Sequence, residues 1–156
     1  MALLEVDNLI TEFATDEGLV RAVDGVSFQL DAGATLGIVG ESGCGKSVTA
    51  LSIMRLLPQP MGRIAGGSIV FQGSDLTQLA IPDMEKIRGR RIGMVFQEPM
   101  TALNPVHTIG RQLTEGMLLH GVCTPSNALR AAADMLDRVG IPSPDLRLGE
   151  YPHQLS

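Results

Sequence analysis

The residues of this chain whose types and spacing best suit chemistry form one short run. The run matches the pattern G-x-x-x-x-G-K-[ST] and consists of Gly40, Glu41, Ser42, Gly43, Cys44, Gly45, Lys46 and Ser47. Glycines in such a run let successive backbone N–H groups approach phosphate oxygens, and a helix that begins here adds the positive end of its dipole. The run therefore predicts a site for the phosphates of a nucleotide, and we extend the site to Val48 in the first turn of the helix.

Two side chains of this run have separate expected roles. We expect the Lys46 ammonium to hold the β and γ phosphates. The Ser47 hydroxyl is a candidate ligand for Mg²⁺, which prefers octahedral coordination by oxygen atoms of protein, water and nucleotide. A glycine-rich turn that matches by chance is the alternative, and the strand and helix predicted on either side argue against it.

A buried strand and a helix are expected to flank the phosphate loop. Residues 35–39 are continuously apolar, which is typical of a strand that is buried on both faces. After the loop, apolar residues recur at the spacing of one helix face: Val48, Leu51, Met54 and Leu57. Pro58 and Pro60 are expected to end this helix, because proline removes a hydrogen-bond donor and clashes with the preceding turn.

The remaining β-type segments predict an antiparallel sheet with one wet face. Residues 3–13 are β-compatible and partly alternate between apolar and polar, and residues 26–30 alternate strictly, with turn signals at 24–25 and 31–33. A further short strand is expected over 68–71. A helix is expected to follow Pro82 and to stop near Gly89. Residues 92–96 predict a second strand buried on both faces, which ends at Gln97.

The last third of the chain predicts helices only. Ile109, Leu113 and Met117 are spaced to form one face of a helix. A second helix is expected from Thr124-Pro125 to Gly140, followed by Pro142. Its predicted inward stripe is Leu129, Ala132, Leu136 and Val139. We expect residues 142–152 to be an ordered but irregular connector.

Length, charge and hydropathy exclude several classes of protein. The chain has 156 residues, which is enough for one domain or a large piece of one, and its formal net charge of −5 argues against a general nucleic-acid surface. With 44% hydrophobic residues it can bury a core, yet no run reaches the roughly 20 apolar residues that span a bilayer. Glu5 and Asp7 argue against a signal peptide, so we expect a cytoplasmic protein. Cys44 and Cys123 have no paired spacing and are expected to be free thiols.

Three segments together resemble a known family. They are GESGCGKSVTALSIMRLL from residue 40, GMVFQEPMTALNPV from residue 93, and the terminal YPHQLS. Over its whole length the chain resembles the ATP-binding subunits of ABC transporters, in the dipeptide/oligopeptide/nickel importer branch. The resemblance implies an α/β P-loop NTPase fold with an N-terminal antiparallel β subdomain and a helical subdomain. It divides the chain into an ATP-binding core at 1–97 and a Q-loop continuation with the helical subdomain at 98–156.

The resemblance implies roles for residues that spacing alone does not assign. Gln97 is similar to the glutamine that begins the Q-loop of the family. That glutamine ligates Mg²⁺, helps to place the attacking water and relays the nucleotide state to the membrane subunit. Gln97 and Lys46 are therefore the expected catalytic residues. Phe13 stands where family members stack the adenine base, a role that suits an aromatic face. The alternative for Phe13 is a core side chain of the antiparallel sheet. Val23 is a weaker candidate for the other side of the base.

Other parts of the family's machinery are not matched. Leu155-Ser156 resembles only the start of the LSGG signature, and the Walker B strand with its Asp and catalytic Glu, the D-loop and the switch histidine are expected downstream of Ser156. His107, His120 and His153 are expected to be partly exposed loop or helix residues. We therefore expect this chain alone to bind nucleotide at most, and an apolar sheet edge to be uncovered where the Walker B strand would pair.

The resemblance also implies partners and a location. It implies ATP and Mg²⁺ as cofactors, with their binding and hydrolysis coupled to substrate uptake. Transmembrane permease subunits are expected to contact the Q-loop and helical subdomain, a second ATPase subunit to complete a homo- or heterodimer, and an external substrate-binding protein to act indirectly. The location is peripheral, on the cytoplasmic side of the inner membrane, and no nucleic acid is expected.

Two other function classes are weighed against the importer. One is a non-hydrolysing nucleotide-binding or interaction fragment, which differs from the importer subunit only in the residues downstream of Ser156. The other is an ABC-type DNA-repair or chromosome-maintenance ATPase, against which the acidic charge and the segment 97–105 both count.

Two smaller features have simple interpretations. The Cys44 thiol, near Lys46 and a helix N-terminus, suits a redox switch that blocks nucleotide, but a tolerated small side chain is the preferred interpretation. Arg88, Arg90 and Arg91 are interpreted as solvated charges near a helix C-terminus rather than as an anion site.

Overall fold

The computed structural model describes residues 2–98 and 102–155 and divides the chain into two compact units. The first unit is Met1–Glu85 and the second is Lys86–Ser156. The expected division into an ATP-binding core at 1–97 and a Q-loop continuation with a helical subdomain at 98–156 is one of function, and it stays a prediction.

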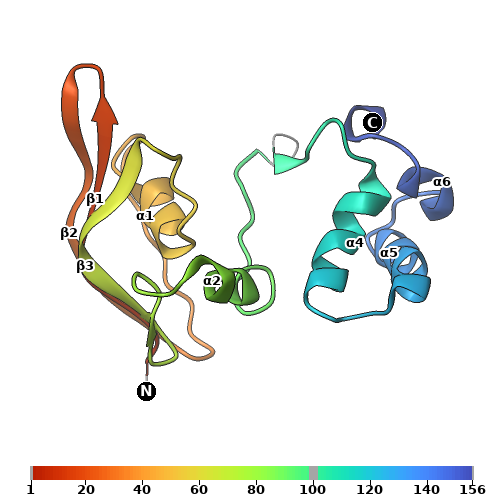
Figure 1. Cartoon of the computed structure of the whole chain (residues 1–156), viewed down its shortest axis with the longest axis horizontal. Helices are drawn as coiled ribbons and strands as arrows, with labels where there is room; N and C mark the ends of the chain where they lie inside the picture. The colour runs from red at the N-terminus through yellow and green to blue at the C-terminus, as the bar shows by residue number, and fades with distance from the viewer. Residues whose placement is uncertain (1, 99–101, 156) are drawn as a thin grey trace. The chain divides into compact units, whose positions relative to one another are not determined.

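The first unit contains a four-stranded antiparallel sheet (Figure 1). Its strands are β1 (Ala2–Thr15), β2 (Gly18–Asp31), β3 (Gly62–Phe71) and β4 (Ser74–Asp75), in the order β2-β1-β3-β4. The strands predicted at 3–13, 26–30 and 68–71 are confirmed, and each is longer than predicted. The side chains of Val6, Leu9 and Ile69 are buried, whereas Glu5, Asp7 and Asn8 are exposed, as expected for a sheet with one wet face.

One predicted turn of this sheet is wrong. Asp24 and Gly25 lie inside β2, where the register shifts so that Leu9 pairs with Val26 and Ile10 pairs with Asp24. Gly25 is therefore the extra residue of a β-bulge, a feature that shares its glycine preference with a turn. The chain reverses instead at residues 16–17, between β1 and β2.

Helix α1 (Lys46–Ile53) packs against β1 and β2 (Figure 1). The predicted inward face is only partly right, because Thr49 and Ser52 are the buried residues of α1 while Val48 and Leu51 are half-buried. Ser52 Oγ donates to the Val48 carbonyl at 2.7 Å and lies 2.8 Å from Thr11 Oγ1 on β1. Since Ser52 has a single hydroxyl proton, Thr11 donates in the second bond. Met54 and Leu57, beyond the helix, are buried as predicted.

Helix α1 ends earlier than Pro58, where the sequence predicted its end. Met54 is the C-terminal cap and Arg55 follows with φ +51°, a left-handed conformation. The Arg55 N–H donates to the Ser52 carbonyl at 3.0 Å, and the next N–H, of Leu56, donates to the Leu51 carbonyl at 2.8 Å. These two bonds form a Schellman motif with arginine in the usual glycine position. The Arg55 guanidinium also donates to the carbonyls of Leu76 and Leu79, which stabilises this conformation.

Helix α2 (Ile81–Ile87) confirms the helix predicted around Pro82. Its one buried side chain, Met84, is fully inaccessible to solvent. Residues 88–91 then turn near Gly89, as predicted.

The second unit is helical, with α4 (Ile109–Leu119), α5 (Pro125–Arg138) and α6 (Pro144–Leu148) packed together (Figure 1). A short 3-10 helix follows at Pro152–Gln154. The core consists of Ile109, Ala132, Leu136 and Leu148, against which Leu113 and Met117 pack, so the predicted face of α4 is confirmed. The connector expected at 142–152 is partly wrong, since α6 forms within it.

The predicted stripe of α5 is half right. Ala132 and Leu136 are buried, but Leu129 is 59% exposed and Val139 is 73% exposed. Ala128 is buried instead, so the buried residues lie four apart along the helix. Small alanines at two of these three positions allow α5 to approach its neighbours closely, which a rule based on large apolar residues does not detect. Thr124 precedes α5 as predicted, but its hydroxyl lies 3.0 Å from the Ser126 hydroxyl and makes no cap bond.

The two strands predicted to be buried on both faces do not form. Residues 35–39 and 93–96 have no strand structure, and Val39 and Val95 are 91% and 93% exposed. A strand exists only by pairing with a neighbour, and within residues 2–98 and 102–155 neither segment pairs with a named strand. The apolar pattern was therefore insufficient for these two predictions.

In the described parts of the chain, no helix combines the length and the apolar composition that crossing a bilayer requires.

Candidate functional site

The phosphate loop is built on backbone conformations that glycine favours. Gly43 and Gly45 have φ of +84° and +89°, in the left-handed region that L side chains rarely adopt. A Cβ on Gly45 would also collide with the Ala22 carbonyl oxygen of β2, whereas a Cβ on Gly43 would meet open space. The loop thus presents its backbone without side chains at these two positions, of which the motif requires Gly45.

Lys46 places a positive charge on the loop. Its Nζ donates to the carbonyls of Gly40 at 2.8 Å and Glu41 at 2.6 Å, and lies 3.5 Å from Cys44 Sγ. The ammonium is therefore held within the run of residues that the motif assigns to the phosphates. Both cysteines of the chain are free thiols, and Cys44 is exposed.

The N-terminus of α1 adds further positive character. Gly45 is the helix cap, and its carbonyl accepts from the Thr49 N–H at 2.8 Å and the Thr49 hydroxyl at 3.0 Å. The N–H groups of the first helical residues precede this first intrahelical bond and have no partner within the helix. The first turn of Lys46–Ile53 contains no acidic residue to neutralise the helix dipole. Ser47 lies in this turn and is exposed, so its hydroxyl is accessible to a ligand.

Val23 lies beside the loop because of a second β-bulge. Thr11 pairs with Val23 while Glu12 pairs with Arg21, so Ala22 is the extra residue of β2. Val23 is buried, and its Cγ2 would lie 3.5 Å from a Cβ on Gly45. The close approach of Ala22 to the loop has no signal in the sequence, since an alanine in a strand carries no positional information.

Phe13 lies on the sheet and is half-buried. It pairs with Val20 on β2 and with Gly62 on β3. Its ring lies so close to Gly62 that a Cβ there would be 2.9 Å from Phe13 Cε1. The residue is partly exposed, and its role in stacking on adenine stays a prediction.

Gln97 lies in the second unit and is exposed. Ser47 belongs to the first unit. The Mg²⁺ ligation that both residues are expected to share stays a prediction. Pro99 and Met100 of the same motif lie outside the described residues.

The segment that follows Gln97 is anchored by Gln112, a residue that sequence reasoning missed. Gln112 Oε1 accepts from the Asn104 N–H at 2.8 Å, and its Nε2 donates to the carbonyls of Asn104 at 3.0 Å and His107 at 2.9 Å. One side chain of α4 thus fixes the turn at 104–107. Glutamine in a helix is too common for its position to predict such contacts.

Several charged groups outside the loop have structural partners. The pKa of Arg21 is raised, mainly by its hydrogen bond with Asp24. The negative charge of Asp24 and the hydrogen bond with Glu12 raise it further. Arg90 donates to the His120 carbonyl at 3.1 Å, at the C-terminal cap of α4, whereas the sequence suggested a charge at the end of the helix that precedes Arg90. His107 and His120 are half-buried and His153 is exposed, as expected.

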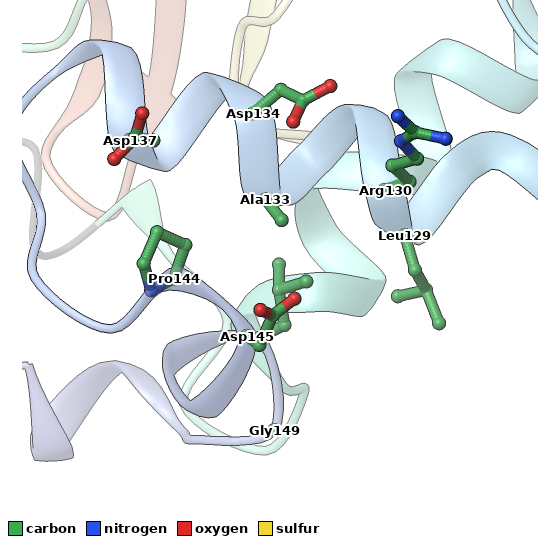
Figure 2. A pocket seen from close by; sticks show the side chains of 9 residues that line it. Leu129, Arg130, Ala133, Asp134, Asp137, Pro144, Asp145 and Gly149 are labelled. Atoms are coloured by element: carbon green, nitrogen blue, oxygen red, sulfur yellow. The ribbon is translucent and has the colours of Figure 1, made fainter.

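Two hollows among the described residues differ in what lines them. One of about 430 Å³ adjoins the phosphate loop and is lined by Val26, Phe28, Leu36, Gly37, Ile38, Val39, Cys44, Gly45, Lys46 and Thr49. The other, of about 780 Å³, lies between α5 and α6 and contains none of the predicted site residues (Figure 2). Asp134, Asp137 and Asp145 line it beside Arg130. Over residues 2–98 and 102–155, no group of three or more His, Cys, Asp or Glu side chains is arranged to hold a metal ion.

Comparison with known proteins decides the family. The model of the ABC transporter family matches residues 23–156, which include the phosphate loop, Gln97 and all of the second unit. The chain belongs to the ABC transporter family. Its phosphate loop and helices α4 to α6 lie within the residues that match the family.

Its similar proteins are named as peptide transport components. A probable peptide ABC transporter ATP-binding protein, y4tR, of Sinorhizobium fredii is 50% identical over 99% of this chain and 46% of its own length. The oligopeptide transport ATP-binding protein OppD of Bacillus subtilis is 47% identical over 99% of this chain and 43% of its own. The chain therefore spans about half the length of these curated relatives.

Solved structures establish the fold. The dimeric structure of MJ0796, a bacterial ABC transporter cassette, matches with a TM-score of 0.78 at 22% identity, over 98% of this chain and 63% of that one. A structure of the same cassette in a post-hydrolysis state bound to ADP and Pi matches equally well. The ABC cassette fold expected from the sequence is confirmed.

Proposed function

We propose that this chain is part of the ATP-binding subunit of a peptide-type ABC importer, which couples MgATP binding and hydrolysis to substrate uptake. The observation that carries the proposal is the phosphate loop, where glycine conformations, the Lys46 ammonium and the start of α1 converge. The names of the relatives support the peptide class of cargo. Activity, cargo and partners are proposed for the whole protein, because the chain spans about half of these relatives.

The residues of the phosphate loop fit a nucleoside triphosphate and Mg²⁺. The backbone N–H groups of Gly43, Gly45 and Lys46 would hold phosphate oxygens, because the two glycines carry no side chain that would block their approach. The Lys46 ammonium would neutralise charge on the β and γ phosphates. Ser47 would contribute its exposed hydroxyl to Mg²⁺, and the bound ion would supply positive charge that polarises the phosphates.

The adenine and the attacking water would be handled by residues outside the loop. Phe13 would stack on the base, with Val23 on its other side. Gln97 would ligate Mg²⁺, help to orient the attacking water and relay the nucleotide state to the membrane subunits. We assign the general base to the remainder of the subunit, and completion of the site to a second ATPase subunit.

The proposed partners follow from the same family. Permease subunits would contact the Q-loop and the helical unit, and an external substrate-binding protein would deliver the cargo. The subunit would lie peripherally on the cytoplasmic side of the inner membrane. The net charge of −5 supports the absence of a nucleic-acid partner.

Calorimetric titration of MgATP into the full-length protein tests the proposal. Lys46→Ala is expected to weaken binding at least a hundredfold, because the phosphates lose their main counter-charge. The chain contains only two lysines, so Lys86→Ala is a matched control that is expected to bind as the wild type does. Equal affinities for wild type and Lys46→Ala would overturn the proposed phosphate site.

Peptide uptake by cells tests the coupling role of Gln97. We expect Gln97→Ala to retain MgATP binding and to lose most of the hydrolysis and uptake. An unchanged uptake rate in that variant would refute the Q-loop assignment. Binding of MgATP without any uptake by the wild-type protein would favour a nucleotide-binding module that does not drive transport.

A further inference from the structure

Glu12 of β1 is a buried carboxylate held between arginines of both neighbouring strands. It is 5% exposed. Its Oε1 accepts from Arg21 Nη2 and Nε on β2, both at 3.3 Å, and its Oε2 accepts from Arg63 Nη2 on β3 at 3.0 Å. The side chains of Arg21 and Arg63 are 51% and 65% exposed. The buried charge is therefore on the carboxylate alone, and the two guanidinium groups offset the cost of burying it.

These ion pairs lie directly beside irregularities in the register of the sheet. On the β2 side, Ala22 is the extra residue of a bulge that separates the Thr11 pair from the Glu12 pair. On the β3 side, Ile10 pairs with Gly66 and Thr11 pairs with Ile64, so a second bulge ends one residue before Glu12. A slip of one residue at a bulge would turn every following side chain to the opposite face of the sheet. Glu12 is the first residue after both irregularities.

Phe13 is the next residue and depends on that register. It pairs with Val20 and Gly62, the direct neighbours of Arg21 and Arg63. Its ring occupies the space over Gly62 where a side chain would otherwise lie. Because adjacent strand residues face opposite sides, the Glu12 ion pairs on one side of β1 fix the ring of Phe13 on the other.

We propose that Glu12 is a positioning residue for nucleotide binding: through Arg21 and Arg63 it fixes the register that presents the Phe13 ring to the adenine base. The inference rests on the proposed function, in which Phe13 stacks on adenine. Glu12 itself does not touch the nucleotide. Its contribution is to hold the ring in one orientation before the base arrives, which lowers the cost of ordering the site.

Comparison of two ligands tests the inference. The dissociation constants of MgATP and of inorganic tripolyphosphate are measured for the full-length wild type, Glu12→Gln, Phe13→Ala and the double variant. Phe13→Ala is expected to weaken MgATP binding about tenfold, and Glu12→Gln about three- to tenfold. Tripolyphosphate binding is expected to change less than twofold in both, because this ligand has no base. The double variant is expected to be no weaker than Phe13→Ala alone.

A second variant and a control keep the test independent of folding. Arg63→Gln removes one ion pair through a largely exposed side chain, and we expect it to weaken MgATP binding about two- to fivefold while the protein remains folded. Glu150→Gln removes a carboxylate that is also paired with an arginine, Arg147 at 2.8 Å, but in the second unit. It is expected to leave both affinities unchanged.

The outcomes separate this inference from the proposed function. Failure of the wild type to bind either ligand would overturn the proposed function itself. If Phe13→Ala selectively weakened MgATP binding but Glu12→Gln and Arg63→Gln did not, the positioning role would be wrong and the proposed function would stand. Equal weakening of both ligands by Glu12→Gln, or additive effects in the double variant, would also overturn the positioning role. An unchanged MgATP affinity in Phe13→Ala would show that Phe13 does not stack on the base, and it would overturn the positioning role of Glu12 as well.

Discussion

Substitution of Gly45 by alanine is the sharpest test of how the phosphate loop is built. The added Cβ has two costs, since φ at Gly45 is +89° and the Ala22 carbonyl occupies the space that the Cβ would take. The left-handed conformation costs about 1–2 kcal/mol in an L residue. Forcing a methyl group against backbone costs about 1–3 kcal/mol more. We therefore expect Gly45→Ala to lower the free energy of unfolding by about 3 kcal/mol.

Gly43→Ala is the matched control, because it has the first cost without the second. Its φ is +84° and its Cβ would meet open space, so a loss of about 1–2 kcal/mol is expected. Urea unfolding followed by circular dichroism measures both variants. With a slope of about 2 kcal/mol per M, the midpoint of Gly45→Ala is expected to lie about 1 M below that of Gly43→Ala. Equal midpoints would refute the close contact between Ala22 and the loop.

Three further predictions concern packing and hydrogen bonds. Thr11→Val and Ser52→Ala are each expected to lower the free energy of unfolding by about 1–2 kcal/mol. The double variant is expected to lose less than the sum, because the two hydroxyls share one buried hydrogen bond of 2.8 Å. Additive losses in urea unfolding would contradict that bond. Leu129→Ala is expected to lower the free energy of unfolding by less than about 0.5 kcal/mol, because Leu129 is 59% exposed. Ala132→Leu is expected to lower it by about 1–3 kcal/mol, because Ala132 is fully buried. Thermal melts that reverse this order would refute the placement of α5. Gln112→Leu is expected to speed hydrogen exchange in the turn at 104–107 by about tenfold or more, as three hydrogen bonds are lost; unchanged exchange would show that the turn holds without this side chain.

Local patterns predicted the features that short-range interactions determine. The phosphate loop and the start of α1 follow from glycines and a lysine at fixed spacing, and the structure has that helix at Lys46. The C-terminal end of α5 was predictable in the same way. Gly140 adopts φ +78° after the helix, and its N–H donates to the Asp137 carbonyl at 2.9 Å.

Features that depend on distant residues could not be predicted. Residues 35–39 have the composition of a buried strand, but a strand needs a partner that its own sequence does not specify. The end of α1 is determined by Arg55, whose left-handed conformation is stabilised by carbonyls more than 20 residues away. The same limit applies to the site, because Ala22 beside Gly45 and Gln112 on the turn at 104–107 act through contacts that leave no local pattern.

Backbone amide NMR of the protein during titration with MgATP tests the central claim most directly. If the loop binds the phosphates, the amide signals of Gly43, Gly45 and Lys46 shift together and saturate at one ligand concentration, and Lys46→Ala abolishes these shifts over the same range. Signals of the loop that stay in place while others shift, or an identical response in Lys46→Ala, would contradict the account.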